Sequence, residues 1–123
     1  YVDFYRNLNL NNGIDNHGIR TINDGGVSFG PYRTLVPGIY TVVCEGIGLD
    51  ELTFECVYTG TDEDGQSTQV QIEKYDIECN GEYIYYTFKC ESTLNNVETR
   101  FYNNSGHDVS LTSLVIKRVG GIE

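Results

Sequence analysis

Three residues near the C-terminal end of the chain, Glu98, Arg100 and Tyr102, have side chains that could together bind a polar ligand. They alternate with valine, threonine and phenylalanine, and alternate side chains of a β-strand lie on opposite faces. If the less polar set points inward, the acid, the arginine and the tyrosine form a row on the outer face. Planar charged groups hydrogen-bond paired hydroxyls, and an aromatic ring stacks on the C–H face of a sugar. The row therefore predicts a carbohydrate ligand, and its alternative is an ordinary ion pair on a solvated face.

Three more residues are candidates for the same site. Tyr85 and Lys89 lie in the segment Glu82–Glu91, which the preceding Asn80-Gly81 predicts to be the second strand of a hairpin. We expect this strand to lie beside the row and to add both side chains to it. Arg33 is expected to be exposed and could reach a ligand from another direction.

The sequence contains no pattern typical of an enzyme or of a resident cofactor. There is no nucleophile motif, no H-E-x-x-H and no phosphate-binding loop. A glycosidase needs two carboxylates that flank the sugar, and such a pair has no characteristic spacing in the sequence. The 18 acidic residues of this chain therefore neither indicate nor exclude one. Asp62, Glu63 and Asp64 are a possible hard-cation cluster, but the spacing of an EF-hand is absent. We therefore expect a non-enzyme without a cofactor.

Length and charge narrow the class of protein further. A chain of 123 residues predicts one domain, residues 1–123, and the absence of an initiator Met suggests that it is excised from a longer protein. The net charge of −10 repels nucleic acid and anionic membranes, and it suits neutral or cationic partners or simply keeps the domain soluble. No run of 18 apolar residues is present, so no membrane insertion is expected.

The four cysteines, Cys44, Cys56, Cys79 and Cys90, form no C-x-x-C pair, which argues against a zinc ribbon. Each is predicted on the inward face of a strand, where free cysteine packs as a small apolar residue. Four buried, reduced thiols would be typical of the cytoplasm. Disulfides in an exported or cell-surface domain are the alternative.

Valine, isoleucine, threonine and tyrosine dominate the ordered-looking stretches, and turn signals recur between them. We predict eight to ten short strands, no helix and an antiparallel β-sandwich of the jelly-roll type. Within it, Tyr1–Leu10 is a weak first strand and Asn11–His17 a loop. Gly30-Pro31-Tyr32 interrupts a strand, and Val36-Pro37-Gly38 is predicted to form a type II turn.

The stretch Gly30-Pro31-Tyr32, followed by Leu35-x-Pro37-Gly38-x-Tyr40-Thr41-Val42, resembles a pattern of small domains attached to bacterial cell-surface polysaccharide glycosyltransferases. Those domains are jelly rolls of the carbohydrate-binding-module type, and the C-terminal third of this chain is similar to them as well. The resemblance implies a non-catalytic glycan-binding module that tethers a covalently linked catalytic domain to a bacterial polysaccharide. It also makes a structural Ca²⁺ possible. The alternative is a structural or oligomerisation domain without a ligand of its own.

Overall fold

The computed structural model describes residues 7–122, and there the chain is built of antiparallel β-strands with one turn of 3₁₀ helix, η1 (Leu49–Glu51). The expectation of an all-β antiparallel fold is confirmed. The nine strands are β1 (Asn9–Asn16), β2 (Ile19–Leu35), β3 (Gly38–Ile47), β4 (Leu52–Thr61), β5 (Ser67–Gln71), β6 (Lys74–Cys79), β7 (Tyr83–Cys90), β8 (Leu94–Asn103) and β9 (Val109–Gly120).

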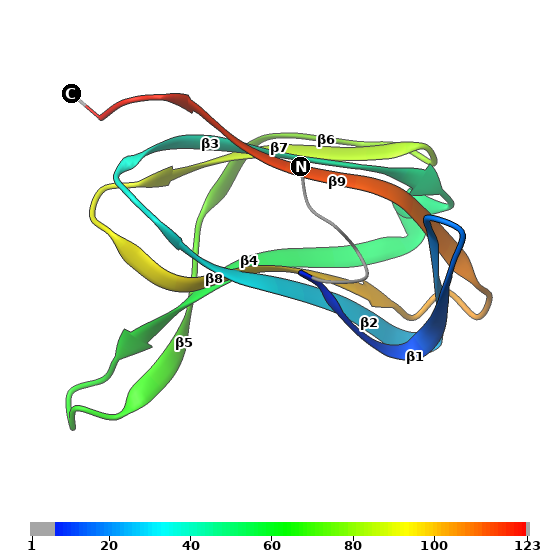
Figure 1. Cartoon of the computed structure of the whole chain (residues 1–123), viewed down its shortest axis with the longest axis horizontal. Helices are drawn as coiled ribbons and strands as arrows, with labels where there is room; N and C mark the ends of the chain where they lie inside the picture. The colour runs from blue at the N-terminus through cyan, green and yellow to red at the C-terminus, as the bar shows by residue number, and fades with distance from the viewer. Residues whose placement is uncertain (1–6, 123) are drawn as a thin grey trace.

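The strands form one sheet, in the order β5-β4-β8-β2-β9-β3-β7-β6, with β1 beside β2. Strand β2 serves both halves of this sheet, because Val27–Leu35 pairs with β8 whereas Arg20–Ile22 pairs with β9. The sheet curls there, so that a first half (β5, β4, β8 and the later part of β2) faces a second half (β9, β3, β7 and β6), as Figure 1 shows.

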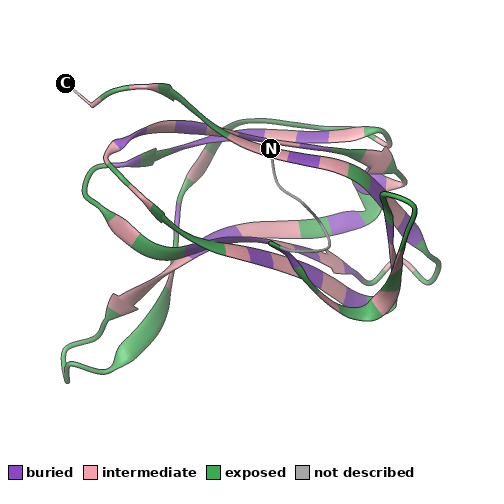
Figure 2. Ribbon diagram, viewed as in Figure 1, coloured by how far each residue is buried: buried purple, intermediate pink, exposed green. Residues whose placement is uncertain are grey.

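Buried residues alternate with less buried ones along the strands of both halves (Figure 2). The buried apolar residues pack into one hydrophobic core cluster. The inward positions predicted for Cys44 on β3 and Cys90 on β7 are confirmed. The residues that share their faces are buried with them: Tyr40, Val42, Ile84, Tyr86 and Phe88. Phe54 of β4 stacks on Tyr86 of β7 with ring centroids 5.7 Å apart, and this contact joins the halves. Full burial of one large apolar side chain contributes about 1.5–3 kcal/mol. The buried side chains between the two halves, including these aromatic rings, are therefore a main source of stability.

Two local predictions were wrong. Residues 11–17, predicted as a loop, mostly belong to β1, where a register shift next to Asn12 absorbs its positive φ of 60°. Asparagine tolerates that conformation, so an Asn-rich stretch with polar faces can remain a strand. The connection at Val36-Pro37-Gly38 is no type II turn, because Gly38 does not have a positive φ. Most of the predicted strand Tyr1–Leu10 lies outside the described residues.

Turn-forming residues at two other places, Asn80 and Gly30-Pro31-Tyr32, do affect the strands around them. Asn80 makes the predicted β6–β7 hairpin, and its side-chain oxygen accepts hydrogen bonds from the backbone N–H groups of Glu82 (2.8 Å) and Tyr83 (3.0 Å). The prediction that Gly30-Pro31-Tyr32 interrupts a strand was only partly correct, because β2 continues through these residues to Leu35. The Gly30–Pro31 bond is cis, Tyr32 has a φ of 64°, and the register with β8 shifts between Pro31 and Arg33.

The cysteine prediction needs one correction. Cys44, Cys56 and Cys90 are buried, but Cys79 is exposed, because it ends β6, the terminal strand of the second half. All four are free cysteines. Burial raises the pKa of the Cys56 thiol to about 12 and raises that of Cys44 further, so both favour the protonated, unreactive form.

Candidate functional site

A pocket lies where the two ends of the curled sheet meet. Strands β5 and β6 follow each other in the chain, yet they are the first and last strands of the sheet order. The two residues between them, Ile72 and Glu73, therefore cross from one half to the other. Ile72 is only 7% exposed, and its N–H donates to the carbonyl oxygen of Cys56 (2.8 Å), which fixes the crossing against the core.

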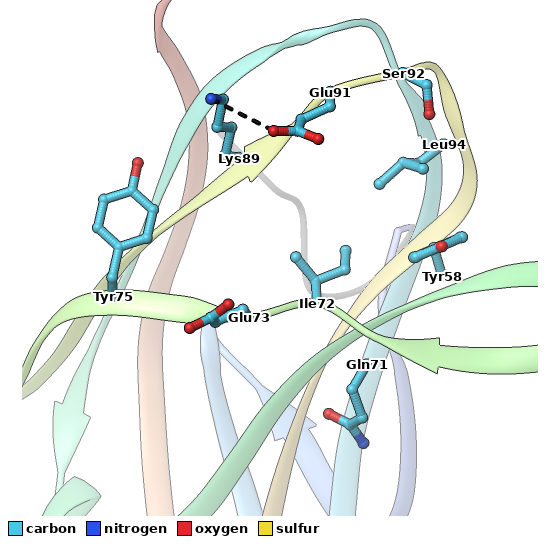
Figure 3. Close-up of a pocket in the computed structure, with 9 residues that line it drawn as sticks. All are labelled: Tyr58, Gln71, Ile72, Glu73, Tyr75, Lys89, Glu91, Ser92 and Leu94. Carbon is cyan, nitrogen blue, oxygen red and sulfur yellow. Dashed lines mark ion pairs between the residues drawn. The ribbon is translucent and has the colours of Figure 1, made fainter.

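The hollow above this crossing has a volume of about 650 Å³, and we call it the seam pocket. Its lining comes from both halves: Tyr58, Gln71, Ile72, Glu73, Tyr75, Lys89, Glu91, Ser92 and Leu94. Figure 3 shows Tyr75 on one side, Tyr58 on the other and Ile72 between them, with Lys89 and Glu91 along the opposite rim. Tyr75 is 39% exposed, so it is accessible to a ligand.

The seam pocket combines an apolar floor with polar groups of several kinds. Lys89 and Glu91 form an ion pair at 3.5 Å, but their side chains are 46% and 79% exposed, so both can still bind another polar group. Gln71 contributes an amide and Glu73 a second carboxylate. A pocket of this size with two aromatic rings and a few polar groups is typical of small-ligand sites.

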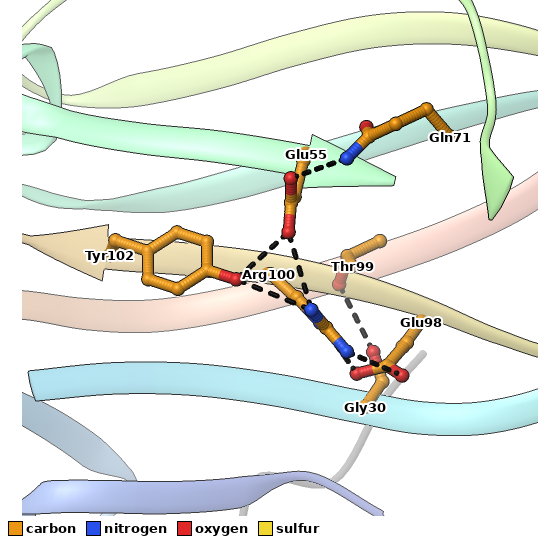
Figure 4. Close-up of polar contacts among 7 residues, drawn as sticks. All are labelled: Gly30, Glu55, Gln71, Glu98, Thr99, Arg100 and Tyr102. Carbon is orange, nitrogen blue, oxygen red and sulfur yellow. Dashed lines mark hydrogen bonds and ion pairs between the residues drawn. The ribbon is translucent and has the colours of Figure 1, made fainter. Parts of the chain in front are cut away.

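The predicted row Glu98, Arg100 and Tyr102 does lie on one face of β8, on the side of the first half turned away from the core (Figure 4). Its arginine is already bonded within the protein. Arg100 donates from Nε and Nη2 to the two carboxylate oxygens of Glu98, at 3.0 and 3.1 Å. From Nη1 it donates to Glu55 and to the Tyr102 hydroxyl, both at 3.4 Å.

Glu55 of β4 completes this group because it lies directly opposite Arg100 in the β4–β8 register. Its carboxylate accepts from the Tyr102 hydroxyl at 2.8 Å and from Gln71 Nε2 at 2.7 Å. We call these five residues, Glu55, Gln71, Glu98, Arg100 and Tyr102, the Arg100 network. Gln71 also lines the seam pocket, so the network borders the pocket.

The bonds of the network favour the charged forms of its two central groups. Burial alone would raise the pKa of Glu55, but hydrogen bonds from Gln71 and Tyr102, together with the charge of Arg100, lower it below its ordinary value. Hydrogen bonds to Glu98 raise the pKa of Arg100. The side chains of Glu98 and Arg100 are only 4% and 18% exposed. The network thus cross-links β4 and β8 and presents few open donors to a ligand.

The other predicted site residues are not beside the row. Tyr85 and Lys89 lie on β7, which pairs with β3 and β6 in the second half, so the expectation that they adjoin β8 was wrong. Lys89 lies instead on the rim of the seam pocket. Arg33 is exposed on β2 opposite Val97, and it does not line the pocket.

Tyr85 lines a second hollow, of about 340 Å³, on the outer face of the second half. Its other lining residues are Val43, Glu45, Glu78, Glu82 and Tyr83. The Tyr85 hydroxyl accepts a hydrogen bond from Thr87 at 3.4 Å. This hollow is smaller than the seam pocket and does not involve the Arg100 network.

Among the described residues, no group of three or more histidine, cysteine, aspartate or glutamate side chains is placed to hold a metal ion. Asp62, the first residue of the acidic loop, uses Oδ1 to accept from the backbone N–H groups of Asp64 and Gln66, both at 2.9 Å. That carboxylate shapes the β4–β5 turn.

Sequence reasoning missed most of the seam pocket, including Tyr58, Gln71, Glu73, Tyr75 and Glu91. Residues 68–75 read as one uninterrupted strand, because the crossing at Ile72-Glu73 contains neither glycine nor proline. Tyr58 alternates with its neighbours in β4, but that pattern indicates a core position as readily as a pocket wall.

Comparison of the chain with protein-family models, with curated proteins and with solved structures gave no match. No helix in residues 7–122 is long and apolar enough to span a membrane.

Proposed function

We propose that this domain is a non-catalytic carbohydrate-binding module and that the seam pocket is its glycan site. The observation that carries the proposal is the pairing of Tyr58 and Tyr75 with Gln71, Lys89 and Glu91 around one hollow of about 650 Å³. Tyrosine rings stack on the C–H faces of sugars, while amide, ammonium and carboxylate groups hydrogen-bond their hydroxyls. Ile72 and Leu94 form an apolar floor. This floor favours a ligand that has an apolar face, such as the C–H face of a sugar, over one that is polar on all sides.

Binding fits this pocket better than catalysis. Glycoside hydrolysis needs one carboxylic acid that stays protonated near neutral pH, and burial is the usual means. Glu91 is 79% exposed and ion-paired with Lys89, so it lacks the burial on which a general acid depends. Glu73, the other acid of the pocket, is also exposed.

The chain connectivity supports the finer assignment of a jelly-roll sandwich. The chain passes from the first half to the second at β2–β3, back at β3–β4, and again at β5–β6, β7–β8 and β8–β9. Repeated crossing between two facing layers is typical of jelly rolls, whose members include lectin domains. In this proposal the module tethers a linked enzyme to a bacterial polysaccharide, as the sequence resemblance implies, and the free thiols support a cytoplasmic location.

The test is a glycan-array screen of the domain, followed by calorimetric titration with the glycan that binds best. Tyr75→Ala should weaken that affinity by about fivefold, since loss of a stacking ring is worth on the order of 1 kcal/mol. Its stability should change little, because Tyr75 is 39% exposed.

Tyr32→Ala is the matched control, because Tyr32 is similarly exposed, at 43%, and lies outside the pocket. It should bind glycan like the wild type. Equal affinity of the Tyr75 variant and the wild type would move the site elsewhere. An array without any bound glycan, together with self-association of the domain, would favour the structural or oligomerisation role instead.

A further inference from the structure

Within residues 7–122, the two terminal strands of the curled sheet, β5 and β6, each have one free edge, and the two edges differ strongly. Strand β6 carries Lys74, Asp76 and Glu78, and its pairing with β7 shifts register between Tyr75 and Glu78, where Asp76 has a φ of 50°. Charged side chains and bulges are features by which proteins prevent an edge from pairing with another chain. The edge of β6 is therefore protected.

Strand β5 has none of these protections. Its sequence, Ser-Thr-Gln-Val-Gln, contains no charge and no proline, and its five residues pair with β4 without a register shift. Four of the five residues are exposed. The β4–β5 hairpin also projects away from the body of the sheet (Figure 1), so another chain can approach this edge.

The hydrogen-bond pattern identifies the backbone groups that face outward. The N–H of Ile72 donates to Cys56 (2.8 Å), and the N–H of Asp62 donates to Gln66 (2.9 Å). In an antiparallel ladder, bonded and non-bonded pairs alternate. With the register Thr59↔Gln69, the backbone groups of Thr68 and Val70 point to β4, whereas those of Ser67, Gln69 and Gln71 point to the free edge.

Charge indicates what the free edge would accept. The segment Leu52–Glu73 contains five acids and no lysine or arginine. Four of these acids are exposed and flank β5, with Asp62, Glu63 and Asp64 before it and Glu73 after it. A second copy of this chain, with a net charge of −10, would bring like charges to both ends of the strand, whereas a cationic segment would be attracted.

We infer that the β5 edge binds an extended lysine- or arginine-bearing segment of another protein, which adds to the sheet as a further strand next to Ser67, Gln69 and Gln71. Main-chain hydrogen bonds to the edge would hold the segment, and the flanking acids would select its charge. This interaction uses the free edge of β5 and not the hollow of the seam pocket, although Gln71 and Glu73 border both, and it goes beyond glycan binding.

The test uses two labelled synthetic peptides with the same β-forming centre, KKTVTVTKK and EETVTVTEE, and fluorescence anisotropy as the readout. The lysine peptide should bind at least about tenfold more tightly at low salt, and added salt should reduce the difference. On binding, the amide protons of Ser67, Gln69 and Gln71 should become protected from hydrogen exchange. Those of Thr68 and Val70 should be protected already.

Gln69→Pro removes one outward N–H without removing a bond to β4, and proline is tolerated at such edge positions. It should reduce affinity for the lysine peptide by about tenfold, since one hydrogen bond is worth on the order of 1 kcal/mol and steric blocking adds to this. Gln69→Thr keeps the N–H and is the matched control. If the proline variant does not fold, protection of the three amides in the wild type decides the question.

Three outcomes would overturn the inference: equal binding by the two Gln69 variants, equal binding of the two peptides, or no change in exchange at β5. Concentration-dependent dimerisation without peptide, abolished by Gln69→Pro, would identify a second copy as the occupant and would also reject it. Tyr75→Ala should leave peptide binding unchanged, so failure of the glycan proposal and failure of this one can be told apart.

Discussion

The Arg100 network and the seam pocket contain the same kinds of side chain but differ in how many of their polar groups are already bonded. In the network, Arg100 makes four hydrogen bonds to Glu98, Glu55 and Tyr102. In the pocket, the lysine–glutamate pair is a single contact of 3.5 Å between exposed side chains. The network holds the strands together, whereas the pocket leaves its charged groups exposed to solvent.

The difference arises from position in the sheet. Strand β8 lies between β4 and β2, so an outward side chain of β8 has neighbours on both sides with which to bond. The pocket lies at the sheet ends, where β5 and β6 each have one paired neighbour within the described residues. An arginine-acid-tyrosine row therefore indicates a ligand site only when its strand leaves those groups without partners.

The largest expected effect is loss of stability in Arg100→Ala. The substitution leaves the Glu98 carboxylate, whose side chain is 4% exposed, without its bidentate partner. Breaking a buried ion pair by removing one partner costs about 3–5 kcal/mol, which urea denaturation would measure. Arg33→Ala removes an exposed arginine and should change the free energy of unfolding by less than about 0.5 kcal/mol. If Arg100→Ala is as stable as the wild type but loses glycan affinity, the contrast drawn between the two regions is wrong.

A smaller effect, which depends on pH, is expected for Glu55→Gln. Because the pKa of Glu55 is lowered in the folded state, the carboxylate stabilises the fold at pH values above its unfolded-state pKa of about 4.3. That stabilisation is lost as the pH falls through the folded-state value. The variant should thus be less stable by about 1.5 kcal/mol at pH 7, with the difference narrowing towards pH 3.

Urea denaturation at the two pH values tests this expectation. Glu91→Gln is the control, because its carboxylate is 79% exposed, and it should alter the free energy of unfolding by less than about 0.5 kcal/mol at pH 7. A difference for Glu55→Gln that is the same at both pH values would show that its ionisation does not stabilise the network.

The smallest effect on stability is expected for Lys89→Ala. Exposed ion pairs contribute about 0–1 kcal/mol, and this one has a contact distance of 3.5 Å with side chains 46% and 79% exposed. Thermal unfolding should be almost unchanged, while glycan affinity measured by titration should fall. A loss of stability similar to that of Arg100→Ala would place Lys89 among the structural residues.

Much of the fold could be predicted because its signals are local. The inward position of Cys44 in its strand and the turn at Asn80 each depend on a few consecutive residues, and the structure confirms both. Most of strand β1 was missed because its asparagines are typical of loops, and pairing with β2 on both sides of the register shift at Asn12 outweighs that preference.

The site was harder to predict because it depends on which strands become neighbours. The sequence showed that Lys89 and Arg100 are both on outer faces, but not that β7 and β8 belong to different halves. Tyr58 and Tyr75 line the same pocket only because a short crossing without a turn residue joins the two ends of the sheet. Long-range strand order of this kind is not encoded in periodicity or in turn composition.

The central position of β9 has a consequence for how the chain folds. Hairpins such as β4–β5 and β6–β7 close over short loops, but β9 pairs with β2 at Arg20↔Leu111 and with β3 at Val42↔Ile116, far apart in the chain. To form those pairings, the chain must close a loop that contains most of its residues. The entropy cost of this closure should limit the folding rate. Folding should therefore take milliseconds to seconds, as in other domains of high contact order, with the hairpins formed before the sheet closes.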